Sequence, residues 1–483
     1  MRKNKFLYDL TIEKIWYGGI WIATHEDWRK IIIKWGLFPW FVVDCKIIKK
    51  KKDYIQAKLL EIKSYGDNSL IDTCKHYKEW CGGCKWSILD YDTQLSYKKD
   101  LILDSFRFFS KFIDKFSDFE MIPAPSQWYY RNKIEFSFGK IFPEENWNLG
   151  FHKQWFFSKV VDVQRCYLIS EKMHTVFDYL KNFLINSWLP VYDQKIHKWF
   201  FRHLVIRQWE NDSILVNLSI SDKYFEQVPN DKHLWDNLIE DIKNDSFLSE
   251  NVNSFYLTYN NELSDAIKSD KNHLVHLYWD LDIVQTLDFG KSKASFKISP
   301  FSFFQTNTEC AVSLFKTAFD MVWPVNWDIL DLYCGAWAVW ISYMKYFSLD
   351  SKLYWIEIVL DAIENAKDNA KLNWMISNTY FVSGQCHKVY NDDNIKSWIN
   401  NLWLIILDPP RSWLEKDIIN FLWELKKSNP QLKILYISCN PVTMSRDLQL
   451  LDDLWYDLLD FKSVDMFPNT HHIESIWLLS AKS

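Results

Sequence analysis

The sequence predicts an α/β protein in three parts: an N-terminal β-barrel, a mixed α+β central domain and a C-terminal Rossmann-like domain. A chain of 483 residues is too long for one hydrophobic core, so about three domains are expected. Residues 1–63 consist of short alternating runs separated by turn signals, the pattern of a small barrel. Residues 64–290 combine a cysteine cluster, strand-like runs and a helix near 91–112, which we expect to pack on the C-terminal domain. In residues 291–483 apolar strands alternate with helical segments, which indicates a parallel α/β sheet.

Net charge and hydropathy limit the partners and the cellular location that we expect for this protein. The net charge of −5 gives no general attraction to nucleic acid, so any RNA contact must come from local basic clusters such as Lys46 and Lys49–Lys52. The first residues lack the apolar stretch of a signal peptide, and no run of about 18 apolar residues could span a bilayer. We therefore expect a cytoplasmic, monomeric enzyme with no membrane partner.

Tryptophan and glycine are present in unusual numbers. The chain has 27 Trp and 11 Gly, whereas ordinary usage would give about 34 glycines. Several Trp also stand where the backbone would need glycine, as in the segments 15–23 and 331–340. Our hypothesis is that the gene is read with a code in which UGA means glycine. The alternative is a protein that is rich in Trp.

The nine cysteines include a close group, Cys74, Cys81 and Cys84, in the pattern C-x6-C-G-G-C. Disulfides are a poor explanation in a reducing compartment, and the two glycines permit a tight backbone on which thiolates converge. Cys166 is the best candidate for a fourth ligand. Four cysteines suit a tetrahedral zinc ion or a four-iron, four-sulfur cluster, and the spacing does not choose between them. Unligated core thiols are the remaining alternative.

A candidate cofactor loop follows the first strand of the C-terminal part. In an open α/β sheet a ligand binds beyond the carboxyl ends of the strands, where a glycine-rich turn lets the backbone approach. The segment DLYCGAWAVW occupies this place; Trp337 and Trp340 would crowd a nucleotide there, and glycine would not. Glu357, at the end of the next strand, can bind the two hydroxyls of a ribose. Neither the phosphate-binding nor the dinucleotide glycine motif is present, and S-adenosylmethionine needs neither.

Three further motifs carry candidate chemical groups: LDPPR with Asp408, ISCNP with Cys439 and HHIESI with Glu474. Methyltransferases that act on amino groups usually place an aromatic residue after a related Asp/Asn-Pro-Pro, whereas here Arg411 follows. This favours methylation of a ring carbon, which needs a covalent nucleophile, over methylation of an exocyclic amine.

Together these residues suit carbon 5 of uracil, which is too weakly nucleophilic to take a methyl group unaided. Attack of the Cys439 thiolate on carbon 6 would produce an enolate whose carbon 5 attacks the sulfonium methyl group. Glu474 would then remove the carbon 5 proton so that the thiolate can leave, while Asp408 orients the base. The uracil must first leave its stack to reach the cleft.

With these motifs in place, the chain resembles the RumA/TrmA family of RNA (uracil-5-)-methyltransferases, and most closely its TRAM-containing, iron–sulfur branch that acts on ribosomal RNA. The resemblance implies a Rossmann-like S-adenosylmethionine-dependent methyltransferase domain, and a TRAM RNA-binding barrel in residues 1–63. It implies Cys439 as nucleophile and Glu474 as base. It also implies an S-adenosylmethionine pocket lined by Gln305, Tyr333, Glu357, Asp408 and Gln385, and a [4Fe-4S] cluster held by Cys74, Cys81, Cys84 and Cys166.

The resemblance leaves some points open. Arg131, Lys133, Arg202 and His203 look like central-domain residues that face RNA, with plain surface charge as the alternative. Ala338 stands where some members have an asparagine that contacts the cofactor, so that contact is expected to be missing. The substrate is expected to be 23S ribosomal RNA rather than transfer RNA. A non-catalytic RNA-binding protein is the alternative if the Trp residues of the cofactor loop are real.

Overall fold

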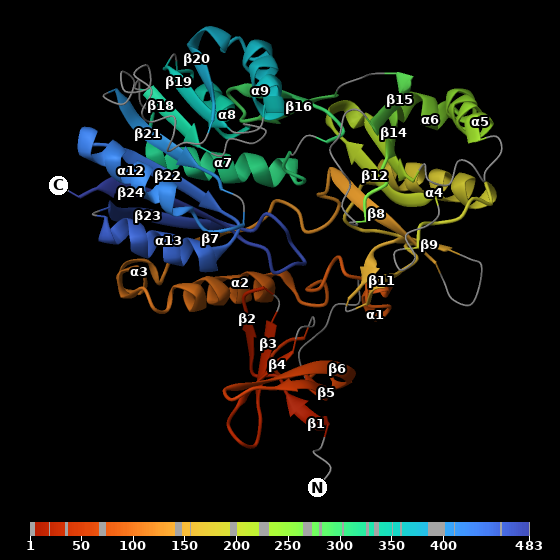
Figure 1. Ribbon diagram of the computed structural model, residues 1–483, viewed down its shortest axis with the longest axis horizontal. Helices are drawn as coiled ribbons and strands as arrows, with labels where there is room; N and C mark the ends of the chain where they lie inside the picture. The colour runs from red at the N-terminus through yellow and green to blue at the C-terminus, as the bar shows by residue number, and fades with distance from the viewer. Residues whose placement is uncertain are drawn as a thin grey trace.

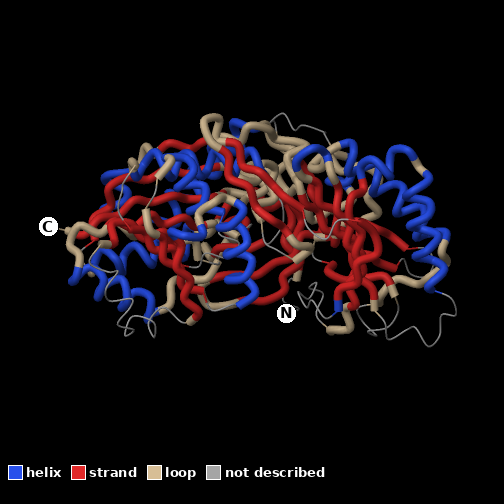
Figure 2. Tube along the Cα trace, turned by 90° about the horizontal axis from the view of Figure 1, so that it is seen from above, coloured by secondary structure: helices blue, strands red, loops and turns tan. Residues whose placement is uncertain are grey.

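The structure is a computed structural model. It describes residues 5–18, 20–33, 37–66, 74–140, 147–154, 156–193, 200–221, 231–263, 273–279, 283–301, 304–324, 328–332, 338–349, 351–357, 360–384, 401–409, 411–454 and 456–482. Three parts, each built on a sheet, follow one another: a small N-terminal module, a central part and a C-terminal part (Figure 1). Seen from above, strands run through the interior of both large parts and helices lie towards the outside (Figure 2). No described helix is both long and apolar enough to cross a bilayer.

The N-terminal module is a single six-stranded sheet in the order β1-β5-β6-β4-β3-β2. Alternate residues such as Ile31, Val43 and Ile55 face its fully buried core, as expected for strands with one face in the interior. The basic cluster, Lys46 with Lys49–Lys52, is exposed on β5 and the turn that follows it. The strands are β1 Phe6–Thr11, β2 Lys14–Trp16, β3 Ile20–Thr24, β4 Lys30–Ile33, β5 Val42–Lys50 and β6 Tyr54–Ser64.

The central part is a six-stranded sheet in the order β15-β14-β13-β12-β8-β9, with helices packed on it and the small β10–β11 ribbon beside it. All its described pairings are antiparallel except β13 with β14, whose connection contains α5 and α6. The elements are α1 Lys75–Lys78, β8 Lys133–Lys140, β9 Trp147–Gly150, β10 His152–Lys153, β11 Phe156–Val160, α4 Glu171–Asn186, β12 Phe201–Gln208, a 3-10 turn Glu210–Asp212, β13 Ile214–Ile220, α5 Asp231–Asn244, α6 Ser246–Asn251, β14 Val252–Tyr259 and β15 Leu274–Trp279.

The C-terminal part is an eight-stranded sheet in the order β20-β19-β18-β21-β22-β24-β23-β7. Strands β20 to β22 are parallel and β24 is antiparallel to β22. The middle strands β18, β21 and β22 are buried along almost their whole length, as expected for a parallel sheet covered by helices. The elements are β16 Ile283–Asp288, β17 Lys293–Ile298, α7 Thr308–Val322, β18 Asp328–Leu332, α8 Ala338–Phe347, β19 Leu353–Glu357, α9 Leu360–Leu372, a 3-10 turn Ile376–Asn378, β20 Thr379–Ser383, β21 Leu402–Leu407, α12 Lys416–Ser428, β22 Lys433–Ser438, α13 Pro441–Asp453, β23 Tyr456–Val464 and β24 Glu474–Ala481.

A segment that precedes the central sheet in sequence packs on the C-terminal sheet. Helix α2 (Tyr91–Phe106) begins at Asp90, whose side chain accepts a hydrogen bond from the Thr93 amide. It contacts α13, and β7 (Glu120–Ile122) pairs with β23 at the sheet edge. Figure 1 shows α2 and α3 (Ser110–Phe116) between the C-terminal sheet and the N-terminal module. The helix near 91–112 therefore lies on the C-terminal part, as two helices rather than one.

Tryptophan occupies backbone positions that glycine normally takes. Among the described residues, eleven non-glycine residues have a positive φ, and six of these are Trp. Four of the six terminate helices: Trp80 after α1, Trp188 after α4, Trp323 after α7 and Trp374 after α9. Left-handed backbone at a helix end favours glycine, because a side chain there meets the following carbonyl. The hypothesis that UGA encodes glycine predicts this distribution. The six are Trp28, Trp40, Trp80, Trp188, Trp323 and Trp374.

Candidate active site and cysteine cluster

The candidate chemical groups meet at one edge of the C-terminal sheet. Strand order reverses between β18 and β21, which is where an open α/β sheet binds its ligand. Asp408 follows β21 and Cys439 follows β22. Glu474 begins β24, which is antiparallel to β22, so it lies at the same edge. The structure thus brings together the residues predicted for the chemical step.

Neighbouring side chains fix the loop that carries Cys439. The Asn440 amide donates to Ser438 Oγ at 3.2 Å, and the Asn440 side chain accepts from two amides of α13, whose first residue is Pro441. Asn440 Nδ2 also donates to the Arg411 carbonyl at 3.0 Å. The nucleophile loop and the loop that follows β21 are therefore held together directly.

Burial and neighbouring charges determine the protonation of Cys439, Glu474 and Asp408. Burial raises the pKa of Cys439 to about 11; Glu474 raises it further, and Arg411 opposes the shift by its charge and by a hydrogen bond to the thiol. Burial and the neighbouring Asp408 raise the pKa of Glu474 well above its usual range. Burial raises the pKa of Asp408 to about 7. The Cys439 thiol is accordingly protonated near neutral pH, and burial favours the neutral form of the Glu474 carboxyl group beside it as well.

Two residues with no assigned role in the sequence analysis belong to this site. Arg411 was noted only as the residue after the prolines; its exposed guanidinium lies against the thiol and 3.4 Å from His472 Nδ1. Tyr17, from the N-terminal module, donates its hydroxyl to the Cys439 carbonyl at 2.8 Å. No sequence signal could have located Tyr17, because 422 residues separate the pair.

The structure describes some of the residues that are expected to line the cofactor pocket. Glu357 ends β19, and its carbonyl accepts from the Gly384 amide at 3.0 Å. The carbonyl of Gln305 accepts from Asn132 Nδ2 at 2.9 Å, so the central part holds this segment in place. Tyr333, Gln385, Gly335 and Trp337 lie outside the described residues.

Asp331, at the end of β18, was quoted in the loop motif but given no role. Its side chain is buried, and among the described residues its Oδ2 atom has no hydrogen-bond partner. Burial, together with Asp408 and Glu357, raises its pKa well above the usual range. A ligand with several donor groups, such as a ribose and an ammonium, fits an edge lined by these three carboxyl groups. The position of an acid at a strand's carboxyl end was the signal that could have identified it.

Trp340 does not occupy the cofactor loop, contrary to expectation. It is fully buried on α8, and its ring meets that of Trp355 at 4.7 Å in a T-shaped contact within the core. The reason is helical periodicity, which directs Trp340 to the face of α8 that packs on the sheet. Crowding of the cofactor by this residue was therefore a wrong expectation.

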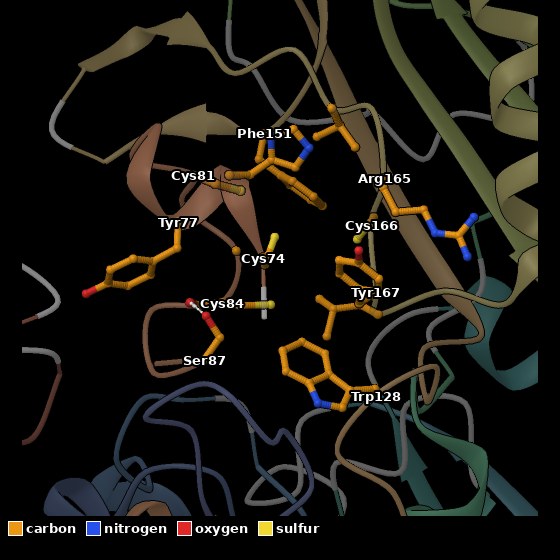
Figure 3. Close-up of a pocket in the computed structure, with 14 residues that line it drawn as sticks. Cys74, Tyr77, Cys81, Cys84, Ser87, Trp128, Phe151, Arg165, Cys166 and Tyr167 are labelled. Carbon is orange, nitrogen blue, oxygen red and sulfur yellow. Dashed lines mark hydrogen bonds between the residues drawn. The ribbon is translucent and has the colours of Figure 1, made fainter. Parts of the chain in front are cut away.

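The four cysteines line a single cavity (Figure 3). Cys74 precedes α1, Cys81 and Cys84 follow it, and Cys166 comes from the loop before α4. Burial and the neighbouring Cys166 and Cys81 raise the pKa of Cys84 well above its usual range. A Cβ at Gly82 would lie 2.7 Å from the His152 carbonyl oxygen, so glycine is needed for this close approach.

The cavity wall also contains aromatic rings, with Trp128, Phe151 and Tyr167 around the thiols (Figure 3). Within the described part of the chain, no three His, Cys, Asp or Glu side chains are arranged to hold a metal ion. The thiols nevertheless converge from separate segments, and four thiol donors around one apolar cavity fit a group that bonds to all of them.

The residues expected to face RNA divide into two groups. Arg131 and Lys133 are partly accessible. Arg202 and His203 are buried, so the expectation that they face RNA was wrong. Arg202 donates to the carbonyls of Asn260 and Glu262 at 2.8 and 2.6 Å, because β12 lies inside the central sheet with both faces covered.

Comparison with known proteins gives consistent matches along the chain. The sequence model of a family described as tRNA (Uracil-5-)-methyltransferase matches residues 90–482. An uncharacterized RNA methyltransferase of Caldanaerobacter subterraneus is 33% identical over 479 residues, covering 97% of both chains. One of Clostridium tetani is 32% identical, covering 99% of this chain and 98% of its own. The Pyrococcus abyssi tRNA (uracil-54, C5)-methyltransferase, solved with S-adenosyl-L-homocysteine, superposes with a TM-score of 0.70 at 22% identity, over 97% of this chain and 99% of that one. The predicted fold class, an α/β S-adenosylmethionine-dependent methyltransferase domain with an N-terminal sheet domain, is confirmed.

Proposed function

Since the chain belongs to the tRNA (uracil-5-)-methyltransferase family, we propose that it methylates one uridine of 23S ribosomal RNA through a covalent bond between Cys439 and carbon 6 of the base. The general reaction is S-adenosylmethionine-dependent methylation of carbon 5 of uracil in RNA. Family membership sets aside the two other classes considered, an exocyclic-amine methyltransferase and a non-catalytic RNA-binding protein.

The observation that supports this chemistry is the grouping of Cys439, Glu474 and Arg411 at one sheet edge. When uracil is bound, the Cys439 thiol gives its proton to solvent and the thiolate sulfur forms a bond to carbon 6; the electrons of the 5,6 double bond move towards the carbonyl oxygen on carbon 4, which gives an enolate. Arg411 favours this step because its charge and hydrogen bond stabilise the thiolate. S-adenosylmethionine supplies the methyl group that carbon 5 takes.

Glu474 completes the reaction. Its carboxylate accepts the proton from carbon 5, the double bond re-forms, and the Cys439 sulfur leaves carbon 6 as a thiolate. Because its pKa is raised, the Glu474 carboxyl group gives up its own proton to solvent before this step, and the carboxylate that results is a stronger base towards a carbon-bound proton. Asp408, beside both groups, would orient the uracil by hydrogen bonding.

The same edge would hold the cofactor. We assign Glu357, Asp408 and Gln305 to its pocket, together with Tyr333 and Gln385. The supporting observation is that Glu357 and Asp408 flank the strand-order reversal, with Asp331 between their strands, whose Oδ2 has no hydrogen-bond partner in the described part of the chain. These residues would bind hydroxyl and ammonium donors and would leave the methyl group facing the base.

The four cysteines would hold a [4Fe-4S] cluster. A cluster is larger than a single zinc ion, and this suits four thiols that surround one cavity. Iron and sulfide analysis of anaerobically purified protein should give about four of each per chain. Stoichiometric zinc in place of iron would contradict the assignment.

The most specific element of the proposed function is the identity of the RNA substrate. We propose a TRAM barrel (1–63), an iron–sulfur and RNA-binding domain (64–290) and a catalytic domain (291–483), and the resemblance to the ribosomal RNA branch is what favours 23S RNA. Transfer RNA is the second candidate, because the family description and the Pyrococcus protein both name it. Mapping 5-methyluridine in 23S and transfer RNA from cells that lack the gene decides between them. We expect one 23S site to lose its mark and to regain it with the wild-type gene but not with Cys439→Ala. Loss in transfer RNA alone would favour the second candidate, and no loss in either would contradict the function.

A further inference from the structure

The N-terminal module reaches the nucleophile loop through one side chain. Tyr17 lies in the turn between β2 and β3, and its hydroxyl donates to the Cys439 carbonyl at 2.8 Å. We infer that Tyr17 is a positioning residue for Cys439: its hydroxyl, by holding the Cys439 carbonyl, sets the reactivity of the catalytic thiol. This inference rests on the proposed role of Cys439 as the nucleophile.

The surroundings of Tyr17 identify it as part of the site. Its ring meets the edge of the His471 ring at 6.4 Å and an angle of 75°. Burial, and next the charges of Cys439 and Glu474, raise the pKa of the Tyr17 hydroxyl, while Arg411 opposes the shift. The hydroxyl is therefore protonated at every working pH and is available as a hydrogen-bond donor.

Separate contacts hold the module against α2, so the bond from Tyr17 does not itself provide the docking. Lys14 Nζ lies 2.6 Å from Asp104 Oδ1 of α2. The ring of Phe38 packs against those of Trp86 and Tyr97, with centroids 5.8 and 6.1 Å apart. These contacts fix the orientation of the module and thereby place the Tyr17 hydroxyl at the carbonyl with little further loss of conformational entropy.

A hydrogen bond to this carbonyl acts on the thiol through the backbone. The carbonyl of Cys439 belongs to the peptide plane between Cys439 and Asn440, so holding it limits rotation of the backbone that carries the side chain. The direction of Sγ towards Glu474, Arg411 and the bound base depends on this backbone. Loss of the bond should therefore reduce the population of the reactive geometry and leave the binding of RNA unchanged.

The test compares Tyr17→Phe with Lys14→Met in the full-length enzyme. Methyl transfer is measured with the RNA substrate and S-adenosylmethionine, together with the rate at which Cys439 is alkylated by iodoacetamide, read from the mass of its peptide. Tyr17→Phe should lower kcat and the alkylation rate by about three- to tenfold, the effect of one lost hydrogen bond, and should leave KM for RNA unchanged. Lys14→Met removes one solvent-accessible ion pair between the module and α2 and keeps the aromatic contacts that orient the module, so it should leave the alkylation rate at the wild-type value.

Several outcomes would overturn the inference. A Tyr17→Phe enzyme with wild-type kcat, or one whose defect lies entirely in KM, would show that the hydroxyl does not position the nucleophile. Equal slowing by Lys14→Met would assign the effect to general docking. Cys439→Ser separates this test from the proposed function: if that variant keeps activity, the nucleophile itself is wrongly assigned, whereas if it is inactive and Tyr17→Phe is normal, only the present inference fails.

Discussion

Lys98 of α2 and Asp465, which follows β23, form an ion pair with both side chains fully buried. The Lys98 ammonium also donates to the Phe467 carbonyl at 3.1 Å. Two charges removed from water are retained only when they are paired and hydrogen-bonded, so this pair fixes where α2 attaches to the C-terminal sheet. Because the N-terminal module packs on the other side of α2, the position of α2 also determines where Tyr17 lies relative to Cys439.

We expect Lys98→Ala to lower the free energy of unfolding by about 3–5 kcal/mol, because it leaves the Asp465 carboxylate buried without its cation. The double variant Lys98→Met, Asp465→Leu should recover most of this loss, since neither charge is then buried. Denaturant unfolding followed by fluorescence measures both. Equal losses in the single and double variants would show that packing, and not the unpaired charge, accounts for the change.

The thiol of Cys439 should react faster as the pH rises. Burial raises its pKa to about 11, so the thiolate fraction grows about tenfold per pH unit below that value. Arg411 lowers this pKa, so Arg411→Met should raise it and reduce alkylation at pH 8 by about threefold or more. Arg446→Met is the matched control, because Arg446 of α13 lies over the Trp413 ring. Unchanged pH profiles in both variants would show that Arg411 has no electrostatic effect on the nucleophile.

Glu474→Gln should allow methyl transfer to the RNA but block release of the methylated RNA from Cys439. The methyl group can still reach carbon 5, but the carbon 5 proton has no acceptor, so turnover should fall by about 10²–10⁴-fold. Methylated RNA should remain attached to the protein through Cys439, and denaturing gels should show the complex. Free methylated RNA produced at the wild-type rate would assign the base to another group.

Trp374→Gly should stabilise the protein. Trp374 is 90% exposed at φ 61° after α9, and left-handed backbone costs a non-glycine residue about 1–2 kcal/mol. The thermal midpoint should therefore rise, whereas Trp235→Gly, which removes a buried ring from α5, should lower it. The mass of the corresponding peptide from the native organism tests the genetic code directly: a Trp mass at residue 374 would contradict the recoding hypothesis.

The sequence predicted the parts of the site that depend on strand ends. Asp408, Cys439 and Glu474 could be grouped beforehand, because strand ends of one sheet meet at one edge and the apolar strands were evident. The positions of Tyr17 and of the Lys98–Asp465 pair could not be predicted from the sequence. Each depends on how separately folded parts pack together, and no local sequence pattern encodes that packing. The prediction that Arg202 faces RNA was wrong for a related reason. A charged residue in a strand normally indicates a face exposed to solvent, but it can be buried when backbone carbonyls accept its hydrogen bonds. The carbonyls of Asn260 and Glu262 do so here.

Trapping of the covalent adduct tests the central claim most directly. RNA that carries 5-fluorouridine at the target position has no carbon 5 proton to remove, so methylation should proceed and release should not. The wild-type enzyme with S-adenosylmethionine should form a stable one-to-one complex, and peptide mass spectrometry should find the methylated fluorouridine on Cys439. An adduct on a different residue, or full methylation of ordinary RNA by Cys439→Ala, would contradict the account.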